Sequence, residues 1–457
     1  MSRARSLKYD EVKPGVSSSC AGINYVHGQY RVILFAILLF ALVAAVVRST
    51  LTGAQERPAS QPAARVTAPR QLVGASSCAA SVCHGGSEIG KPLSEATTWR
   101  ALDPHARAYD TLLTPASLAM TKRLLGDKTY AHETPLCLKC HVHPEYDHAR
   151  PNFRKADGVG CESCHGSAQD WLTPHYRGDW KQADKKAFGL ADTKSLPIRA
   201  AICARCHVGT PAANVDHDLI AAGHPALRFE FATYLANLPP HWDVAKDKSR
   251  HRDGNGVVHF EASAWTIGQI VSTRHALELL AHRADPASAK PWPEFAELDC
   301  FACHHHLQSP TWRQKKAHVG ARRPGGVAWS SWYFTSGPKF DDVRPSAKTR
   351  AGLAKKARIA AERLRVASHQ SGQVHRDLSG LELSAATTEP PTWEHAVQNY
   401  LALLASRQFK RDNNRVDEKH ERLIARRRQE ITLEPGFLSP RRFVPKLLEN
   451  PGLPSPD

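Results

Sequence analysis

The pattern of apolar and polar residues divides the 457-residue chain into segments of different character. In the last third, apolar side chains recur at spacings of three and four residues, which is the period of one face of an α-helix. Two series have this spacing: Leu353, Ala357, Ala360 and Leu364, and then Trp393, Val397, Tyr400, Leu401 and Leu404. Thr392, just before the second series, is a residue type that caps helix N-termini. The pattern predicts a helical region over residues 311–457.

The segment from residue 74 to about residue 310 shows neither a sustained helical period nor the alternation of a β-strand. It contains most of the histidines and many Gly, Pro and Trp residues, and the Gly and Pro residues interrupt regular elements. This composition predicts short helices joined by long loops around something other than a protein core. Together with the C-terminal pattern, it places the protein in the mainly α class.

A continuous apolar run lies near the N-terminus, where Val32–Val47 contains sixteen residues without a polar break. A membrane span needs about 17 to 25 residues, and the flanking Tyr30, Arg31 and Arg48 can extend this run by snorkelling. The alternative is the hydrophobic region of a secretory signal, but that region has about 7 to 15 residues and ends in a small-x-small cleavage site. The cleavage signal here is poor. We therefore predict a transmembrane anchor, or an uncleaved signal, over residues 31–48.

Basic residues predict the orientation of this anchor. Four of them precede it within the first thirty residues: Arg3, Arg5, Lys8 and Lys13. By the positive-inside rule, residues 1–30 stay in the cytoplasm and the chain that follows the anchor is exported. Residues 49–73 are rich in Ala, Pro, Ser and Gln, which is typical of a flexible linker. The expected location is the inner membrane, with the bulk of the chain in the periplasm.

The formal net charge is +17 and is concentrated in one region, since residues 311–457 contain 27 Lys and Arg against 15 Asp and Glu. A basic surface suits an acidic protein partner or an anionic membrane. Nucleic acid is not expected, because the chain has no recognition motif for it and is predicted to be exported.

Ten of the eleven cysteines form five close pairs, and only Cys20 stands alone. Four pairs have the form Cys-x-x-Cys-His, as CLKCH, CESCH, CARCH and CFACH. This is the attachment signature of c-type haem, in which both thiols bond to the porphyrin vinyl groups and the adjacent histidine becomes an axial ligand of the iron. The predicted haem-binding residues are Cys137, Cys140, Cys161, Cys164, Cys203, Cys206, Cys300 and Cys303, with His141, His165, His207 and His304 on the iron.

Zinc is the main alternative for these four motifs, because paired Cys-x-x-Cys motifs can form a Cys₄ or Cys₃His site. A zinc site does not require a histidine directly after each second cysteine, however, and here the histidine follows in all four. A redox motif of the thioredoxin type would be expected once, near a βαβ pattern. The repetition therefore favours haem.

The first cysteine pair differs, because CAASVCH places four residues between Cys78 and Cys83 before His84. A loop of four residues can bulge outward while both sulfurs keep their positions. We predict a fifth haem here, with a local disulfide or free thiols as the alternative.

The second axial ligands are expected to be histidines, because the chain has only two methionines, Met1 and Met120, and 25 histidines. At most one haem can have methionine as its second ligand, and bis-histidine ligation is expected for the others. The candidates are His105, His175, His217 and His224, each of which follows a haem motif in an aromatic or Pro/Gly-marked segment. For each of them an ordinary surface or capping role is the alternative. A reserve set consists of His143, His148, His241, His305 and His306.

The order of these motifs resembles that of a known family. CAASVCHGG is followed by Trp-x-x-x-Asp-Pro-His, CLKCH, DGVGCESCHGSAQDW, CARCHVG, HDLIAAGHP, WPEF and CFACHHH. Over residues 74–310 the chain is similar to multihaem cytochromes c of the cytochrome c-554 type. The resemblance implies a mostly helical domain around closely packed haems. It also implies that histidines such as His105 reach a haem other than the nearest one in sequence, and that the usual role is electron transfer.

Electron carriage between redox partners with acidic docking faces is the first functional hypothesis, and it requires no catalytic residue. The second is a multihaem reductase or oxidase that acts on a small nitrogen or oxygen compound at a five-coordinate haem. The sequence has no Cys-x-x-Cys-Lys variant of the kind that multihaem nitrite reductases use. A third hypothesis, compatible with the first, makes the basic helical region 311–457 a module that docks the cytochrome onto a larger complex.

Overall fold

The structure is a computed structural model that describes residues 69–288, 290–300, 303–304, 328–335, 347–370, 393–415 and 417–432. They all fall in one unit, which extends from Pro69 to Asp457. The predicted cytoplasmic segment, the membrane anchor and most of the linker lie outside the described residues. Among the helices that are described, none is both long and apolar enough to cross a membrane.

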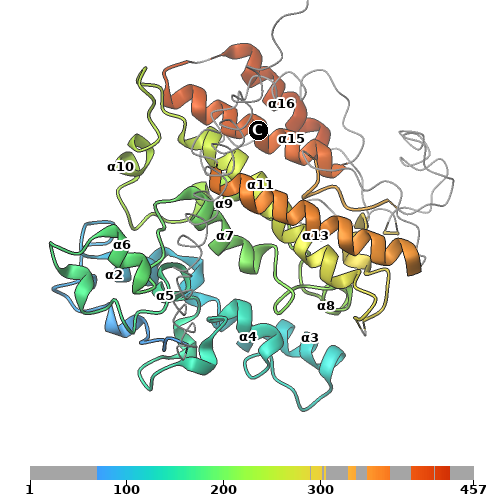
Figure 1. Ribbon diagram of the computed structural model, residues 1–457, viewed down its shortest axis with the longest axis horizontal. Coiled ribbons are helices and arrows are strands. Elements are labelled where there is room, and N and C mark those ends of the chain that lie inside the picture. Colours follow the sequence, from blue (N-terminus) through green and yellow to red (C-terminus); the bar gives the residue numbers. More distant parts are fainter. Residues whose placement is uncertain are drawn as a thin grey trace, which may run out of the picture. The chain divides into compact units, whose positions relative to one another are not determined.

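The described residues are mainly helical, as predicted, and their only β-structure consists of isolated bridges (Figure 1). Most helices before residue 250 are short and are joined by loops and single 3-10 turns. The α-helices are α2 (Glu95–Leu102), α3 (Pro115–Leu125), α4 (Pro135–His141), α5 (Cys161–His165), α6 (Gln182–Ala187), α7 (Leu196–His207), α8 (His217–Ala222), α9 (Phe231–Asn237), α10 (Val244–Ser249), α11 (Phe260–Arg283), α13 (Ala347–Gln370), α15 (Trp393–Asp412) and α16 (Glu418–Thr432).

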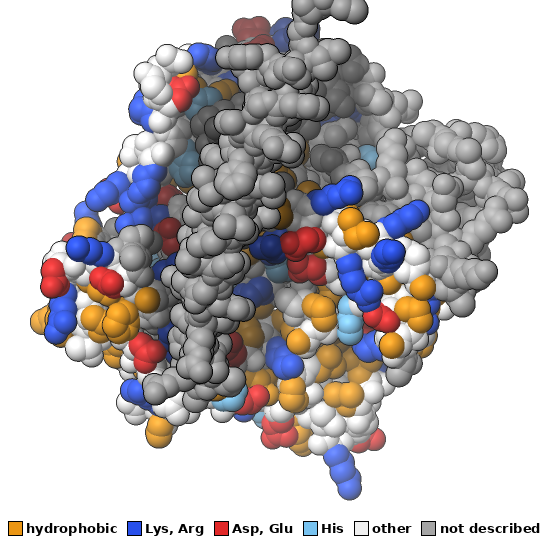
Figure 2. Space-filling model, in the orientation of Figure 1, with side chains coloured by type: hydrophobic (Ala, Val, Ile, Leu, Met, Phe, Trp, Pro, Cys, Tyr) orange, Lys and Arg blue, Asp and Glu red, His pale blue; other side chains and the backbone are white. Residues whose placement is uncertain are grey.

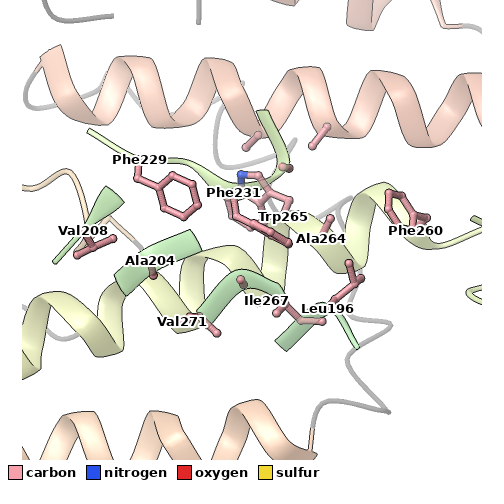
Figure 3. Close-up of a cluster of buried hydrophobic side chains, with 14 of the residues drawn as sticks. Leu196, Ala204, Val208, Phe229, Phe231, Phe260, Ala264, Trp265, Ile267 and Val271 are labelled. Carbon is pink, nitrogen blue, oxygen red and sulfur yellow. The ribbon is translucent and has the colours of Figure 1, made fainter. Parts of the chain in front are cut away.

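Helix α11 is the centre of the largest apolar core. It contacts α7 and α9, which precede it in the chain, and α13 and α15, which follow it (Figure 1). Sixteen of its 24 residues are buried, so the helix is enclosed on more than one face. Figure 3 shows Phe229, Phe231 and Trp265 in the cluster of side chains that fills the space around α11. Ala402 and Ala405 of α15 belong to the same cluster.

The two helical series expected in the C-terminal region are confirmed. Leu353 and Ala357 of α13 are buried against Leu277 and Leu280 of α11. The apolar series of α15 is buried as well, and it packs against α16 through Ile424. Thr392, the expected cap, lies outside the described residues. The division at residue 310 stays a prediction, and the helices on its two sides share one core.

Gly268 allows α9 and α11 to approach each other closely. A Cβ atom built on Gly268 would lie 2.6 Å from the Cβ atom of Phe231, which is closer than real Cβ atoms approach. Gly352 of α13 is a helical glycine in the opposite situation, because a Cβ atom there would meet nothing within 4 Å.

We expect Gly268→Ala to lower the free energy of unfolding by about 1 to 3 kcal/mol, because the added methyl group overpacks the contact with Phe231. Gly352→Ala is the matched control, and it should raise the same quantity by up to about 1 kcal/mol through helix propensity. Urea unfolding of the two variants, followed by circular dichroism, measures both effects. Equal stability of the two variants would contradict the packing described here.

Candidate haem-binding sites

Three of the four Cys-x-x-Cys-His motifs form a helical turn that contains or ends with the histidine, and the described residues of the fourth have the hydrogen bond of such a turn. CLKCH closes α4, CESCH forms α5, and CARCH closes α7. In CFACH the amide of His304 donates to the carbonyl of Cys300 at 2.8 Å, which is the spacing of an α-turn. Residues three and four apart lie on the same face of a helical turn. Each motif therefore presents its two thiols and its imidazole to one side, which fits attachment of a single haem.

The first motif reaches a related arrangement through its longer loop. The amides of Cys83 and Gly85 both donate to the carbonyl of Ala80, at 2.9 and 3.0 Å, so the loop closes tightly. Gly85 lies so near the backbone of Ala79 that a Cβ atom would be 2.0 Å from its carbonyl oxygen. Val82, within the loop, is 84% exposed. The extra residues thus bulge outward, while Cys78 is buried.

Four of the five motif histidines lie face to face or edge to face with a second histidine from a distant segment. The ring centroids of His84 and His175 are 6.2 Å apart, and those of His105 and His207 are 5.9 Å apart. The other two pairs are His141 with His224 at 6.5 Å and His165 with His241 at 6.4 Å.

This spacing is the one that a shared metal ion requires. Two imidazoles that bind one ion through nitrogens about 2 Å from it have ring centres about 6 Å apart. The four pairs are at that separation, and each contains one histidine of a cysteine motif. The residues therefore fit an iron between each motif histidine and its partner, as bis-histidine haem needs.

Hydrogen bonds at Nδ1 orient several of these rings and leave Nε2 for a metal. The Nδ1 atom of His84 lies 2.8 Å from Glu95 Oε2, and that of His105 lies 2.9 Å from Asp103 Oδ1. Backbone carbonyls accept from three more of these rings, at 2.9 Å for His141, 2.5 Å for His175 and 2.8 Å for His224. An outer-shell acceptor of this kind fixes the tautomer and raises the basicity of the ligating nitrogen.

Burial keeps most of these imidazoles in the neutral form, which is the form that binds iron. Burial lowers the pKa of His165 and of His207 to about 4, and it also lowers the pKa of His141 and His224. His105 is the exception. Burial alone would lower its pKa, but the hydrogen bond to Asp103 and the charge of that carboxylate together outweigh burial and raise it.

The structure brings three of the four predicted partner histidines, His105, His175 and His224, against motif histidines. The fourth, His217, packs edge-on against Phe295 at 5.4 Å instead, and its amide donates to Glu294. His241, which the sequence placed only in reserve, takes the position beside His165. Its segment, Pro-Pro-His-Trp, carries the same proline and aromatic markers as that of His175, so the same signal applied to it.

The remaining reserve histidines do not form such pairs where they are described. His143 is buried, and its Nδ1 accepts from the amide of Glu145, while His148 is exposed. His305 and His306 lie outside the described residues. In the part of the chain that the structure describes, no ring contact joins His304 to another histidine.

The motifs adjoin one another in a definite order. The thiols of Cys78 and Cys161 lie close enough for each to shift the pKa of the other, and so do those of Cys140 and Cys206. Arg205, within CARCH, donates to the carbonyl of Ser163, within CESCH, at 2.8 Å. The motifs therefore lie side by side in the order first, third, fourth and second.

All ten cysteines in the described residues are free thiols, and no three His, Cys, Asp or Glu side chains there gather as a zinc site would require.

Glu162 ties the CESCH turn to the start of the described chain. Its carboxylate is buried and accepts from the amides of Val73, Gly74 and Ala168 at 2.7 to 3.0 Å. A buried carboxylate needs such donors to compensate for the water it has lost. Glu162, one of the two residues between the cysteines, thus fixes the position of the third motif.

Residues 77–166 match the family model described as cytochrome c554 and c-prime. Over this segment the chain is similar to cytochromes c of that type. The cytochrome c554 match begins one residue before Cys78 and ends one residue after His165, so it includes the first motif with its longer spacing. It implies haem c as the cofactor and electron transfer as the general role. No curated protein and no solved structure matches the chain.

We expect Glu162→Ala to lower the free energy of unfolding by about 3 kcal/mol or more, because three buried amides lose their acceptor. Glu88→Ala, at an exposed position, is the control and should change stability by less than about 0.5 kcal/mol. Urea unfolding of the haem-loaded protein gives both values. A loss of the same size in both variants would show that Glu162 does not anchor the motif.

Replacement of His241 tests the pairing with His165. We expect His241→Ala to convert the haem of the third motif from six-coordinate low-spin to high-spin iron, in a proportion of one haem per chain. Electron paramagnetic resonance of the oxidised protein measures this change. His148→Ala, at an exposed histidine, should leave the spectrum as it is. An unchanged spectrum in the His241 variant would remove His241 from the axial ligands.

Proposed function

We propose that the protein is a membrane-anchored, periplasmic cytochrome that carries electrons between redox partners through five covalently attached haems. The observation that carries this proposal is the set of four histidine pairs, each at the separation of a bis-histidine iron and each including a motif histidine. Iron with two histidine ligands has no open position for a substrate, so these sites suit electron transfer.

The order of the motifs supports a single path for electrons. Since the neighbours run from the first motif to the third, the fourth and the second, the haems attached there would form a continuous series. Among these four motifs, the first and second are then the two ends of the series, where electrons would enter and leave. The intervening protein contributes ligation, burial and hydrogen bonds, which tune each potential.

Exposed apolar side chains lie near both ends of this series. Val82, Leu93 and Tyr176 are exposed near the first motif or its partner histidine, and Leu113 and Leu136 are exposed near the second. Figure 2 shows apolar side chains interspersed with Lys, Arg, Asp and Glu on the displayed face. Transient redox complexes use small patches of this mixed kind. We propose that redox proteins dock at these patches, and that the basic residues concentrated in residues 311–457 attract partners with acidic faces.

The location is proposed from the sequence alone, from the apolar run Val32–Val47 and the basic residues before it. Export agrees with the motifs, because the proposed haem attachment takes place outside the cytoplasm.

One observation favours the alternative of a reductase or oxidase that acts on a small nitrogen or oxygen compound. The four histidine pairs account for His84, His141, His165 and His207. The remaining motif, CFACH with His304, is the fifth motif in the chain. A five-coordinate iron would therefore have to be at this motif. A high-spin ferric signal in the resting protein would favour this alternative, and low-spin signals alone would favour the carrier.

The number of haems can be counted from the intact mass of the purified protein, because each covalent haem adds its full mass. We expect five, and we expect Cys300→Ser with Cys303→Ser to remove one. Cys20→Ser is the matched control, since Cys20 belongs to no motif, and it should leave the count at five. A colourless protein, or one that carries zinc, would refute the proposed function.

A further inference from the structure

The fifth motif lies next to a buried ion pair that has no role in the electron transfer proposed above. Arg228 and Glu394 approach to 3.2 Å, and their side chains are only 5% and 1% exposed. The guanidinium lies over the rings of Trp332 and Trp393, at 5.7 Å from each. Charges that are this well buried are poorly screened by water, so their fields act on nearby groups.

Arg228 is the member of the pair that contacts the motif. Its Nη2 atom lies 3.4 Å from Sγ of Cys300, one of the two sulfurs predicted to carry haem. Glu394 lies on the other side of the pair and is held by donors from residues 330–332. The amides of Ser331 and Trp332 donate to its Oε2 at 2.5 and 3.1 Å. The cation is therefore the member of the pair that contacts the sulfur, while the anion contacts the cation and residues 330–332.

Phe229, which follows Arg228 in the chain, links this pair to the fourth motif. Its ring stacks on that of His207, with centroids 5.5 Å apart and an interplanar angle of 19°. Figure 3 places Phe229 near Ala204 and Val208, at the end of α7. Trp332 Nε1 donates to the carbonyl of Phe229 at 3.0 Å, so a residue of the C-terminal region holds Phe229 in place. Consecutive residues thus contact the fifth and the fourth motif.

We propose that Arg228 and Glu394 are positioning residues that set the potential of the haem at Cys300 and Cys303 and hold that haem beside the haem of the fourth motif. The inference rests on the proposed function, since it requires haem at the fifth motif. Glu394 belongs to α15, so the C-terminal helices would contribute a residue to a redox site. Oxidised haem carries one more positive charge than reduced haem, so a nearby cation favours reduction and a nearby anion favours oxidation.

The two members of the pair give variants with opposite expected effects. Glu394→Gln leaves the cation uncompensated and should raise the midpoint potential of one haem. Arg228→Gln leaves the anion uncompensated and should lower the potential of the same haem. Spectroelectrochemical titration of the full-length, haem-loaded protein measures these shifts. The variant with Cys300→Ser and Cys303→Ser, which lacks this haem, identifies its contribution to the titration curve.

Glu261→Gln is the matched control, because Glu261 belongs to a largely buried ion pair with Lys248 at 2.9 Å that contacts no cysteine motif. It should leave every potential unchanged. Shifts of the same sign in the two test variants, shifts spread over all haems, or no shift would overturn the proposal.

Loss of one buried charge can prevent folding, and the double variant Arg228→Gln/Glu394→Gln avoids an unpaired charge. It should lower the potential of the same haem, because the nearer charge of the pair is the cation, and an upward shift or no shift would overturn the proposal. Intact mass separates this inference from the proposed function. Five haems without the expected shifts refute the inference alone. Four haems, with none at Cys300 and Cys303, refute the inference and the haem proposed at those two cysteines. A protein without haem refutes both proposals.

Discussion

The separation of the histidine rings is the constraint on which the arrangement of residues 69–250 depends. Each pair, at 5.9 to 6.5 Å, joins a cysteine motif to a segment far away in the sequence. Iron bound by such a pair would hold the two segments together, which is the role of an apolar core in other proteins. This accounts for the short helices and irregular loops, because a segment that is held by a ligand at one point does not need a long amphipathic helix.

The distribution of apolar clusters supports this division of the molecule. Around the first three motifs the buried clusters are small, and one contains only Leu112, Ala131, Leu138 and Val142 as fully buried members. Around α11 the clusters are large and include residues from α7 to α16. The described chain therefore combines a part with small apolar clusters, which the proposed haems would stabilise, with a helical core that packs as ordinary proteins do. The fifth motif follows α11 in sequence, and Arg228 brings it into contact with this core.

Two buried glutamates show how the polypeptide fixes its motifs without a metal. Glu162 accepts from three backbone amides beside the third motif, and Glu394 accepts from residues 330–332 and pairs with Arg228 beside the fifth. Each carboxylate is compensated for the loss of water by several donors, so each holds its neighbours in one geometry.

Features that depend on neighbours within a helical turn could be predicted from the sequence alone. The motif spacing predicted the attachment residues, the apolar period predicted α13 and α15, and the order of motifs predicted the family later matched over residues 77–166. Which histidines lie together could be seen only in the folded chain. His241 stands beside His165, while His217 packs on Phe295, although both lie in similarly marked segments. The physical reason is that local spacing specifies contacts within a turn, whereas a contact between distant segments depends on how every intervening loop and helix packs. Glu394 meets Arg228 for the same reason, because an apolar helix face predicts burial and does not predict which surface will cover it.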